Sequence, residues 1–339
     1  MKVENRKNNN FDLLKVIAIF MVFVLHYLNK NFGGALAGTE VYSFNYVISH
    51  FIESLSIVAV NLFVLISGYF MIDKQEVKFS KIFMILFTLV FYCFVSYIIA
   101  LLIGLAKIDI TSVKVFIKSI IEFWYVYIYI ILYLISPFIN KLINSISKRN
   151  FQHLLIISII FFVIWPSILN NITVKDNGYG IINFIILYMV AAYIRKYGIK
   201  SKINDLCIYF GCTIMTTLCS FFMGRAYGYN FVFNFISSVA LFNYFTKLEI
   251  NCDFQKISKH TLGMYIIHLQ PFLVEYIYHS IFKCSLYYNS NLFLIHLVTT
   301  CVIMFICCLI IDILKQKTID KTFVKMMKKN KYYNYLFKL

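Results

Sequence analysis

The sequence has few of the residues that mark soluble domains and flexible linkers. Charged residues make up only 14% of its 339 residues, whereas 61% are hydrophobic, and the mean hydropathy is +0.77. This composition excludes an ordinary soluble domain. The chain has only three prolines, and no linker, soluble domain or internal repeat is evident. We therefore predict a polytopic membrane protein that folds as one bundle.

Compact metal and redox motifs are also missing. The nine cysteines form no C-x-x-C pair and the histidines form no H-E-x-x-H motif, so we predict no metal site and no permanently bound cofactor. The cysteines lie mostly inside apolar segments, where we interpret them as packing residues. The first apolar segment carries Asp12 and Lys15 and no small-residue cleavage site follows it. We expect this segment to remain as a helix.

Ten apolar stretches are long enough to predict membrane-spanning helices. They cover residues 11–30, 46–72, 82–106, 119–140, 153–170, 179–194, 205–223, 231–246, 261–281 and 292–314. The expected fold is an all-α integral membrane bundle of about ten transmembrane helices. We predict one transmembrane domain over 1–314 and a basic cytoplasmic tail over 315–339.

The basic residues predict the orientation of this bundle. Of the 32 Lys and Arg residues, 24 fall in the amino-terminal arm, in the segments 73–81, 141–149, 195–202 and 247–259, and in the tail. Because basic residues are retained on the cytoplasmic side, both termini are predicted to be cytoplasmic. Topology and anionic lipid explain the net charge of +17, so we expect contact with membrane lipids and not with nucleic acid. The tail, with its interleaved tyrosines, is typical of an interfacial amphipathic segment.

Lys15 and His26 are two ionisable residues in the first apolar segment. Their separation of eleven residues leaves them about 20° apart around a helix and about 16 Å apart along it, so both project from one face. With Lys15 near the cytoplasmic interface, His26 lies about halfway across a hydrocarbon core of about 30 Å. A histidine at that depth marks a substrate path, a proton relay or a catalytic site. The alternative is a packing histidine beside a snorkelling lysine.

The second and fourth segments add polar and aromatic groups. Glu53 lies 19 residues before Ile72, about 28 Å along a helix, which places it near the outer interface. There it either orients a hydroxyl acceptor or is a hydrated interfacial carboxylate. Trp124 and Tyr125 belong to an aromatic band that is typical of membrane anchors but also suits stacking on sugar rings. We expect Pro137 to end the fourth span.

The ninth segment carries Tyr265 and His268, which are three residues apart and so share a helix face. Pro271 follows, and we expect it to interrupt the helix and free backbone carbonyls to line a cavity. The alternative is a single histidine that bonds to a neighbouring helix. Between the second and third spans, Lys74, Lys78 and Lys81 form a cluster that suits phosphate groups, although positive-inside topology explains such lysines equally well.

Four stretches together resemble the membrane acyltransferase-3 family, whose members transfer acyl groups to polysaccharides, lipopolysaccharides and related envelope glycans. The stretches are Phe11–Lys15 through His26, Leu62–Tyr69, Phe123–Tyr125 with Leu132–Pro137, and Ser258–His268. The resemblance implies that His26 is catalytic and that Lys15 contacts the acyl-CoA donor. It also implies that the acceptor is modified outside the cytoplasm, and it corresponds to the short form without an appended periplasmic domain.

Two features depart from the family pattern. The arginine pair that many O-antigen acetyltransferases carry after the Ser-Gly motif is replaced by Lys74 and Lys78, and a Lys cannot reproduce the bidentate fork of Arg. The stretch from Tyr188 to Tyr193 has alanine where a glycine is usual.

We therefore expect a membrane O-acyltransferase, most simply an O-acetyltransferase, that moves an acyl group from acetyl-CoA or another acyl-CoA to a hydroxyl of an exopolysaccharide, capsule or cell-wall glycan. His26 acts as general base or as a transient acyl carrier. The expected donor-binding residues are Lys15, Lys74, Lys78 and Ser67, and the expected acceptor-binding residues are Glu53, Trp124, Tyr125, Tyr265 and His268. The alternative function is a glycan or lipid-linked sugar transporter without chemistry. A composition rich in Lys, Asn, Ile and Phe indicates an AT-rich bacterium and so its cytoplasmic membrane, and the oligomeric state is not predicted.

Overall fold

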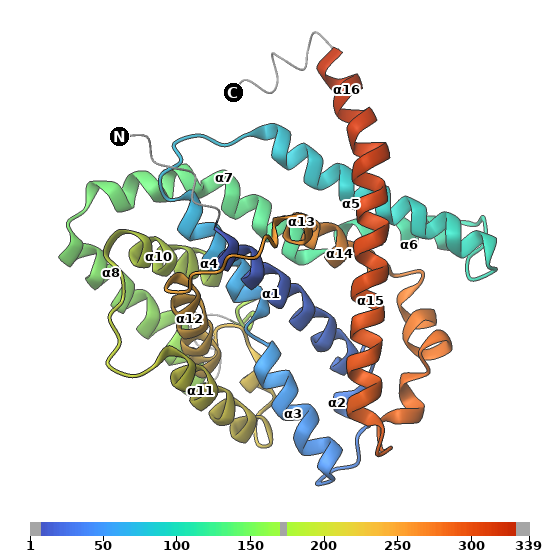
Figure 1. Cartoon of the computed structure of the whole chain (residues 1–339), viewed down its shortest axis with the longest axis horizontal. Helices are drawn as coiled ribbons and strands as arrows, with labels where there is room; N and C mark the ends of the chain where they lie inside the picture. Colours follow the sequence, from blue (N-terminus) through green and yellow to red (C-terminus); the bar gives the residue numbers. More distant parts are fainter. Residues whose placement is uncertain (1–7, 170–174, 330–339) are drawn as a thin grey trace.

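The computed structural model describes residues 8–169 and 175–329, and their regular structure is entirely helical (Figure 1), which confirms the all-α prediction. The amino-terminal arm and the tail tyrosines Tyr332, Tyr333 and Tyr335 lie outside these residues. In chain order, the longer helices are α1 (Asn9–Leu28), α3 (Phe44–Ser56), α4 (Ala59–Met71), α5 (Phe79–Leu102), α6 (Ile110–Ile121), α7 (Trp124–Ser145), α8 (Lys148–Ile159), α10 (Ile181–Tyr197), α11 (Asp205–Ser220), α12 (Val232–Thr246), α15 (Phe293–Lys315) and α16 (Lys321–Lys329).

Short helical turns complete the bundle. They are α2 (Ala35–Gly38), α9 (Trp165–Ile168), α13 (Gln255–Ser258), α14 (Thr261–Ile267), the π-helical turns η1 (Ile160–Ile164), η3 (Tyr276–Ile281) and η5 (Gln316–Asp320), and the 3₁₀ turns η2 (Gly224–Tyr227) and η4 (Cys284–Tyr287). Side-chain caps begin several of the longer helices: Ser43 caps α3, Asp109 caps α6 and Ser147 caps α8. Each accepts a hydrogen bond from a backbone N–H of the first turn.

Six helical stretches in the described residues are long and apolar enough to cross a membrane. They are Asn9–Leu28, Phe44–Met71, Phe79–Leu102, Trp124–Ser145, Lys148–Ile168 and Phe293–Lys325. The four other predicted spans are also helical, but α10, α11 and α12 have 17, 16 and 15 residues, and the ninth is broken. The multi-pass architecture is therefore clear, and the count of ten spans stays a prediction.

Two prolines lie within helical stretches because side chains replace the hydrogen bonds that they remove. From the sequence we expected Pro137 to end the fourth span. This expectation is wrong, because α7 continues to Ser145. The Tyr133 carbonyl, which has no N–H to accept at Pro137, accepts the Ser136 hydroxyl at 2.8 Å. Pro166 frees the Phe162 carbonyl in the same way, and the Asn230 amide donates to it at 3.2 Å.

The ninth predicted span is interrupted near Pro271, as the sequence predicted: α14 ends at Ile267 and helical turns resume only near η3. Side chains of the break cap carbonyls of the last turn of α14. The His268 ring contacts the Met264 oxygen at 2.8 Å through Nδ1, and the Gln270 amide donates to the Ile266 oxygen at 2.9 Å. The break therefore fixes the orientation of His268.

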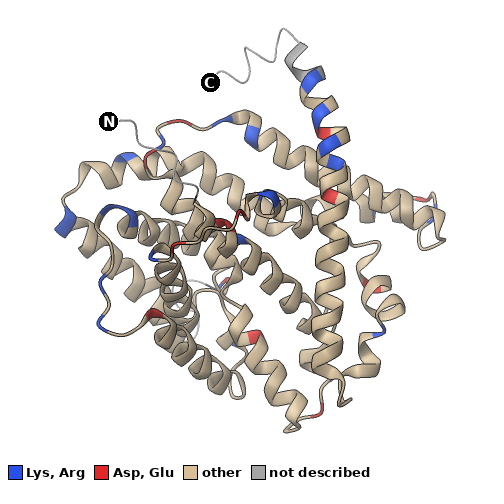
Figure 2. Cartoon of the chain, viewed as in Figure 1, with Lys and Arg blue, Asp and Glu red and all other residues tan. Residues whose placement is uncertain are grey.

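The segments that we expected on the cytoplasmic side meet at one end of the bundle, which we call the basic end. Side-chain bonds join them: Asn140 to the Lys74 carbonyl, Lys196 to Asn144, and Asn9 to the Ile250 carbonyl. Figure 2 shows Lys and Arg along α16, on the segment leading into α5, and near the turn between α7 and α8. The loops around α2 and η4 form the other end, where the Asn45 amide donates to the carbonyls of Tyr288 and Ser290. The common location agrees with the predicted topology, in which the basic end is cytoplasmic.

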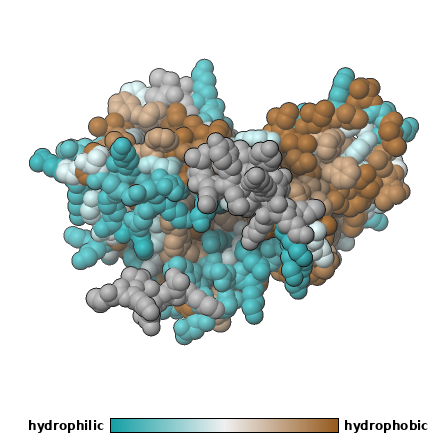
Figure 3. Space-filling model, turned by 90° about the horizontal axis from the view of Figure 1, so that it is seen from above, coloured by the Kyte–Doolittle hydropathy of each residue, from teal (hydrophilic) through white to brown (hydrophobic). Residues whose placement is uncertain are grey.

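Lipid-facing surface is evident on α5 and α6. The right-hand part of Figure 3, where α6 lies in Figure 1, is mostly hydrophobic. The exposed apolar side chains include Phe94, Ile98 and Leu102 on α5 and Ile110, Ile117 and Ile121 on α6. A soluble monomer rarely exposes such a continuous apolar surface, whereas a protein in hydrocarbon requires it.

The centre of the bundle is the packing of α1, α4, α10 and α12. Fully buried side chains include Leu14 and Phe23 on α1, Tyr188 on α10 and Phe242 on α12. Gly68 allows α4 to approach α10, because a Cβ at this position would lie 2.6 Å from the Tyr188 carbonyl oxygen. The glycine of the Ser67-Gly68 motif therefore has a packing role.

The helix that carries the predicted tail boundary is continuous. The stretch α15–η5–α16 runs through residues 314 and 315 without a break and projects from the basic end (Figure 1). Phe323 on α16 stacks on Phe87 of α5, with ring centroids 3.9 Å apart, and on Phe83 at 5.6 Å. The described part of the tail is therefore packed against α5.

Candidate active site

A cavity of about 1140 Å³ lies in the middle of the bundle, and it contains most of the residues that the sequence singled out. We call it the central cavity. Its volume slightly exceeds the usual range of about 300–1,000 Å³ for small-molecule sites. Side chains from α1, α3, α4, α5, α7 and α14 line it. Its polar and aromatic lining includes Lys15, His26, Asn29, His50, Glu53, Ser67, Lys81, Trp124, Tyr125, Tyr129, Tyr179, Tyr227, Tyr229 and Tyr265.

His26 and Lys15 both line this cavity, so the prediction that they share one face of the first helix is confirmed. His26 contacts His268 behind it: Nδ1 of His26 lies 2.8 Å from Nε2 of His268. His268 is only 1% exposed and is not part of the cavity wall. The ring of Phe32, from the loop after α1, packs edge-on against His26 with centroids 5.0 Å apart.

The hydrogen bonds behind His26 determine its tautomer. The Met264 carbonyl can only accept, so Nδ1 of His268 carries the proton of their 2.8 Å bond. Nε2 of neutral His268 is then the acceptor, and His26 donates to it through Nδ1–H. Nε2 of His26 therefore has a free lone pair, and it is the ring nitrogen left for the cavity. A nitrogen in this state is suited to act as a base or a nucleophile.

Lys15 lies toward the basic end of the central cavity. Its Nζ contacts Asp12 Oδ1 at 3.0 Å, and the Ser258 hydroxyl donates to the same oxygen at 2.7 Å. Asp12 thus holds the ammonium in place, and Ser258 fixes Asp12 across the junction of α1 and α13. Ser67 also lines the cavity, but its hydroxyl donates to the Phe63 carbonyl of its own helix at 2.9 Å.

Lys74 and Lys78, which we expected to bind the donor, do not line the central cavity. Both are exposed, and only their backbone groups make the bonds that tie this loop to α7, to Asn140 and Tyr133. The lysine that reaches the cavity from this region is Lys81. It is the third residue of α5, so the helix directs its side chain inward, whereas Lys74 and Lys78 precede the helix.

Lys81 is held by aromatic side chains and not by a carboxylate. Its Nζ donates to the Tyr129 hydroxyl at 2.7 Å and lies 4.5 Å from the centroid of the Tyr133 ring. Such a cation–π arrangement fixes the ammonium without neutralising it. Lys81 therefore keeps its positive charge available to a ligand.

Glu53 lines the outer part of the central cavity and is 7% exposed. One of its carboxyl oxygens, Oε2, has no hydrogen-bond partner among the described residues. A buried carboxyl oxygen without a donor costs free energy of about 1–3 kcal/mol or more, so it normally indicates a missing partner such as a ligand hydroxyl. His50, on the same helix, is already bonded to the hydroxyls of Ser220 and Tyr227 at 2.9 and 2.8 Å.

Aromatic side chains form the wall near Glu53. The ring centroid of Trp124 lies 4.7 Å from that of Tyr179 and 5.9 Å from that of Tyr229, and Tyr179 and Tyr229 are 4.7 Å apart. Burial raises the pKa of Tyr229 well above its usual range, so its phenol stays neutral. Tyr125 and Tyr265 continue this wall toward His26, with centroids 5.7 Å apart. These neutral rings provide flat faces and hydroxyl groups.

The structure thus brings together Lys15, His26, Ser67, Glu53, Trp124, Tyr125 and Tyr265 in one cavity. His268, which we expected against the acceptor, instead supports His26 from behind, because the Pro271 break turns its ring toward α1. Sequence reasoning missed Tyr179 and Tyr229, which lie in loops and have no helical periodicity. It grouped Lys81 with Lys74 and Lys78 and gave no signal that separated them.

Among the described residues, no group of three or more His, Cys, Asp or Glu side chains is arranged to hold a metal ion. A comparison with family models matches residues 8–313 of the 339 to the acyltransferase-3 family, whose model is described as an acyltransferase domain. Neither the curated proteins nor the solved structures contain a match. The matched region includes every residue of the central cavity. The chain therefore belongs to the acyltransferase-3 family and is a membrane acyltransferase.

Proposed function

We propose that this enzyme transfers an acyl group, most simply acetyl, from acyl-CoA at the basic end to a hydroxyl of an extracytoplasmic glycan. The observation that carries the proposal is the free Nε2 of His26 in a cavity that has fixed lysines on one side. On the other side lies an aromatic wall with an unpartnered oxygen of the Glu53 carboxyl. The proposal takes the basic end as cytoplasmic, because Lys and Arg are retained on that side.

The donor would enter beside Lys15 and Lys81. The phosphates of CoA are anionic and suit lysine ammonium groups, whereas the arm that carries the thioester is linear and less polar. Apolar side chains of α1 line the path from Lys15 to His26, among them Ile19 and Val22. The eleven residues between Lys15 and His26 correspond to about 16 Å along α1. An extended donor can therefore keep its phosphates at the basic end while its thioester lies beside His26.

The acceptor would lie against Trp124, Tyr179 and Tyr229 with one hydroxyl directed toward His26. Sugar rings present C–H faces that pack on aromatic rings, and they present hydroxyls that can donate to Oε2 of Glu53. A glycan therefore suits both the aromatic wall and the Glu53 carboxyl oxygen. The same features support a hydroxyl acceptor over a purely hydrocarbon one, which would leave Glu53 without a partner.

In the direct mechanism, Nε2 of His26 removes the proton of the acceptor hydroxyl as its oxygen attacks the thioester carbonyl carbon. The C–S bond then breaks, and the CoA thiolate takes the hydroxyl proton from Nε2. While His26 is protonated, His268 accepts the Nδ1–H bond and stabilises the imidazolium. Acyl ester and free CoA are the products, and the histidine returns to its starting state.

In the two-step alternative, Nε2 of His26 attacks the thioester carbonyl carbon, the C–S bond breaks, and CoA leaves as a thiolate. The acceptor hydroxyl then attacks the acyl-imidazole, the acyl–nitrogen bond breaks, and the hydroxyl proton neutralises the released thiolate. Both mechanisms need the same free Nε2. A rapid-quench experiment without acceptor separates them, since only the two-step mechanism releases one equivalent of CoA per enzyme in a burst.

The test uses purified protein in vesicles with radiolabelled acetyl-CoA on the side of the basic end and glycan from a strain lacking the gene on the other side. We expect labelled glycan and stoichiometric free CoA, and we expect His26→Ala to abolish both at equal membrane abundance. Activity of this variant within a few-fold of wild type would remove His26 from the mechanism. Movement of glycan without any release of CoA would instead support the transporter alternative.

A further inference from the structure

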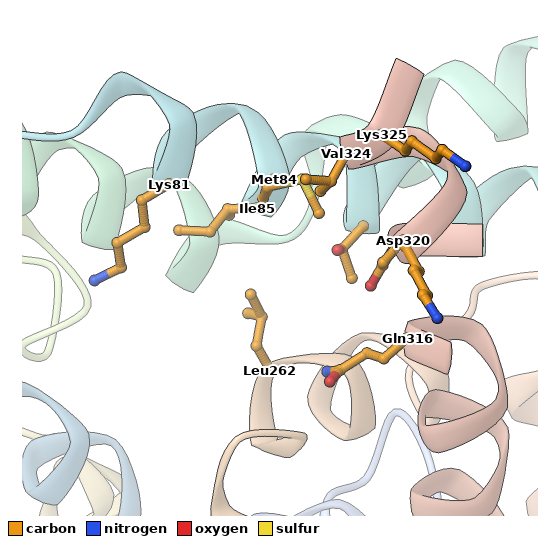
Figure 4. A pocket seen from close by; sticks show the side chains of 10 residues that line it. Lys81, Met84, Ile85, Leu262, Gln316, Asp320, Val324 and Lys325 are labelled. Atoms are coloured by element: carbon orange, nitrogen blue, oxygen red, sulfur yellow. The ribbon is translucent and has the colours of Figure 1, made fainter. Parts of the chain in front are cut away.

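A second cavity, of about 740 Å³, opens between α5, α14 and the η5–α16 stretch; we call it the side cavity (Figure 4). Its lining consists of Lys81, Met84, Ile85, Thr88, Leu262, Gln316, Asp320, Lys321, Val324 and Lys325. Lys81, Ile85 and Leu262 also line the central cavity. The two cavities therefore share a wall at the basic end, and Lys81 lies at their junction.

The side cavity has an excess of positive charge. Its one carboxylate, Asp320, forms an ion pair with Lys315 at 2.9 Å, and the Lys315 side chain is only 3% exposed. Lys81, Lys321 and Lys325 form no ion pair with a carboxylate among the described residues. Figure 4 shows Lys81 and Lys325 on opposite sides of the cavity, with Gln316 and Asp320 on the side of Lys325. The lysines thus provide positive groups at separate points, which suits an elongated anion with more than one phosphate.

Packing holds this arrangement in place. Phe323 lies between Lys321 and Lys325 in the sequence, and it stacks on Phe83 and Phe87 of α5. Buried Lys315 also donates to the Thr88 hydroxyl of α5 at 2.8 Å. The helix that carries two of the lysines is therefore docked on the helix that carries the third. A volume of about 740 Å³ lies within the usual range of about 300–1,000 Å³ for small-molecule sites.

We infer that the side cavity binds the nucleotide and phosphate part of the acyl-CoA donor, with Lys81 beside the arm that enters the central cavity and Lys321 and Lys325 beside the far phosphate. The inference rests on the proposed function. It follows from the shared wall, because a donor whose thioester reaches His26 must place its anionic end near Lys81. A phosphate headgroup of an anionic lipid has the same charge, and the experiment below separates the two sources.

The experiment measures displacement of radiolabelled acetyl-CoA by CoA and by pantetheine, which lacks the nucleotide and all phosphates. It uses full-length protein in neutral detergent. For Lys81→Gln and for the double variant Lys321→Gln/Lys325→Gln, we expect the dissociation constant of CoA to rise about tenfold, or about 1.4 kcal/mol. The dissociation constant of pantetheine should stay within twofold of its wild-type value. Lys78→Gln and Lys317→Gln are matched controls, since both lysines are exposed and lie outside the two cavities.

Three results would overturn the inference. The first is an unchanged CoA constant in both lysine variants, and the second is an equal rise for CoA and pantetheine, which indicates a general change of structure. The third is a rise that appears only after reconstitution with phosphatidylglycerol and is absent with phosphatidylcholine, which identifies a lipid site. If wild-type protein does not bind acetyl-CoA at all, the proposed function fails, and this outcome is distinct from a failure of the side cavity alone.

Discussion

Replacing His268 tests the tautomer argument directly. In His268→Ala, Nδ1–H of His26 loses its acceptor at 2.8 Å, and the imidazolium that forms during transfer loses a hydrogen bond. A hydrogen bond to a charged group contributes about 1.5–3 kcal/mol. Because each 1.36 kcal/mol in the barrier is a factor of ten, we expect kcat to fall about 10- to 150-fold. His26→Ala removes the base itself and should leave no measurable transfer.

The assay is CoA release at saturating glycan, with acetyl-CoA affinity measured separately. His268 does not line the central cavity, so the affinity for acetyl-CoA should change by less than about twofold, a difference below about 0.5 kcal/mol. His268→Gln should recover most of kcat, since its side-chain oxygen can accept from His26 while its amide donates to the Met264 carbonyl. This rescue distinguishes a positioning role from a general packing role.

His296→Ala is the matched control. His296 is another histidine in a predicted span, and it contacts the Tyr27 hydroxyl at 2.7 Å and the Phe282 carbonyl at 2.9 Å. It lies outside the central cavity, so its loss should lower thermal stability and leave kcat unchanged. A kcat within twofold of wild type for His268→Ala, or a Gln variant no better than the Ala variant, would exclude a positioning role for His268.

Three further predictions follow from the cavity and the packing. Lys15→Ala should weaken CoA binding in detergent more than Lys15→Arg does, because the positive charge is the main requirement; equal affinities in calorimetry would leave Lys15 with a snorkelling role. Glu53→Gln and Trp124→Ala should raise KM for glycan and leave acetyl-CoA affinity nearly unchanged, and steady-state kinetics that show only a donor effect would contradict the two-sided geometry. Gly68→Ala should lower stability by about 1–3 kcal/mol in a thermal-shift or denaturation assay, because the new Cβ meets the backbone of Tyr188. Gly211→Ala, whose new Cβ would point into open space beyond its own helix backbone, should be neutral or stabilising by up to about 1 kcal/mol.

The helices and the Lys15–His26 face could be predicted from the sequence, since both depend on hydropathy and on the helical repeat alone. The lengths of the helices that lie inside the bundle were harder to predict. Helices α10 and α12 are largely buried by protein, so their apolar residues say little about the membrane. The helix through Pro137 was also missed, because its continuation depends on a local bond from the Ser136 hydroxyl.

Contacts between distant segments could not be predicted. The bond between His26 and His268 joins residues 242 positions apart. In the sequence, the helix face that His268 shares with Tyr265 indicated only that His268 was polar and accessible. The selection of Lys81 over Lys74 and Lys78 depends on where α5 begins, and the boundary of a helix is the least certain part of a sequence prediction. Tyr179 and Tyr229 join the aromatic wall through loop geometry, which no periodic pattern indicates.

The hydrogen-bond chain behind His26 also has a consequence for the energetics of the membrane. The chain runs from His26 through His268 and ends on the Met264 carbonyl, which cannot take up a proton. A proton that His26 removes from the acceptor therefore has no exit along this route and leaves with the CoA thiol. Under the proposed mechanism each turnover is electrically neutral across the bilayer. The energy of the thioester alone then drives acylation, so transfer would need neither a membrane potential nor a proton gradient.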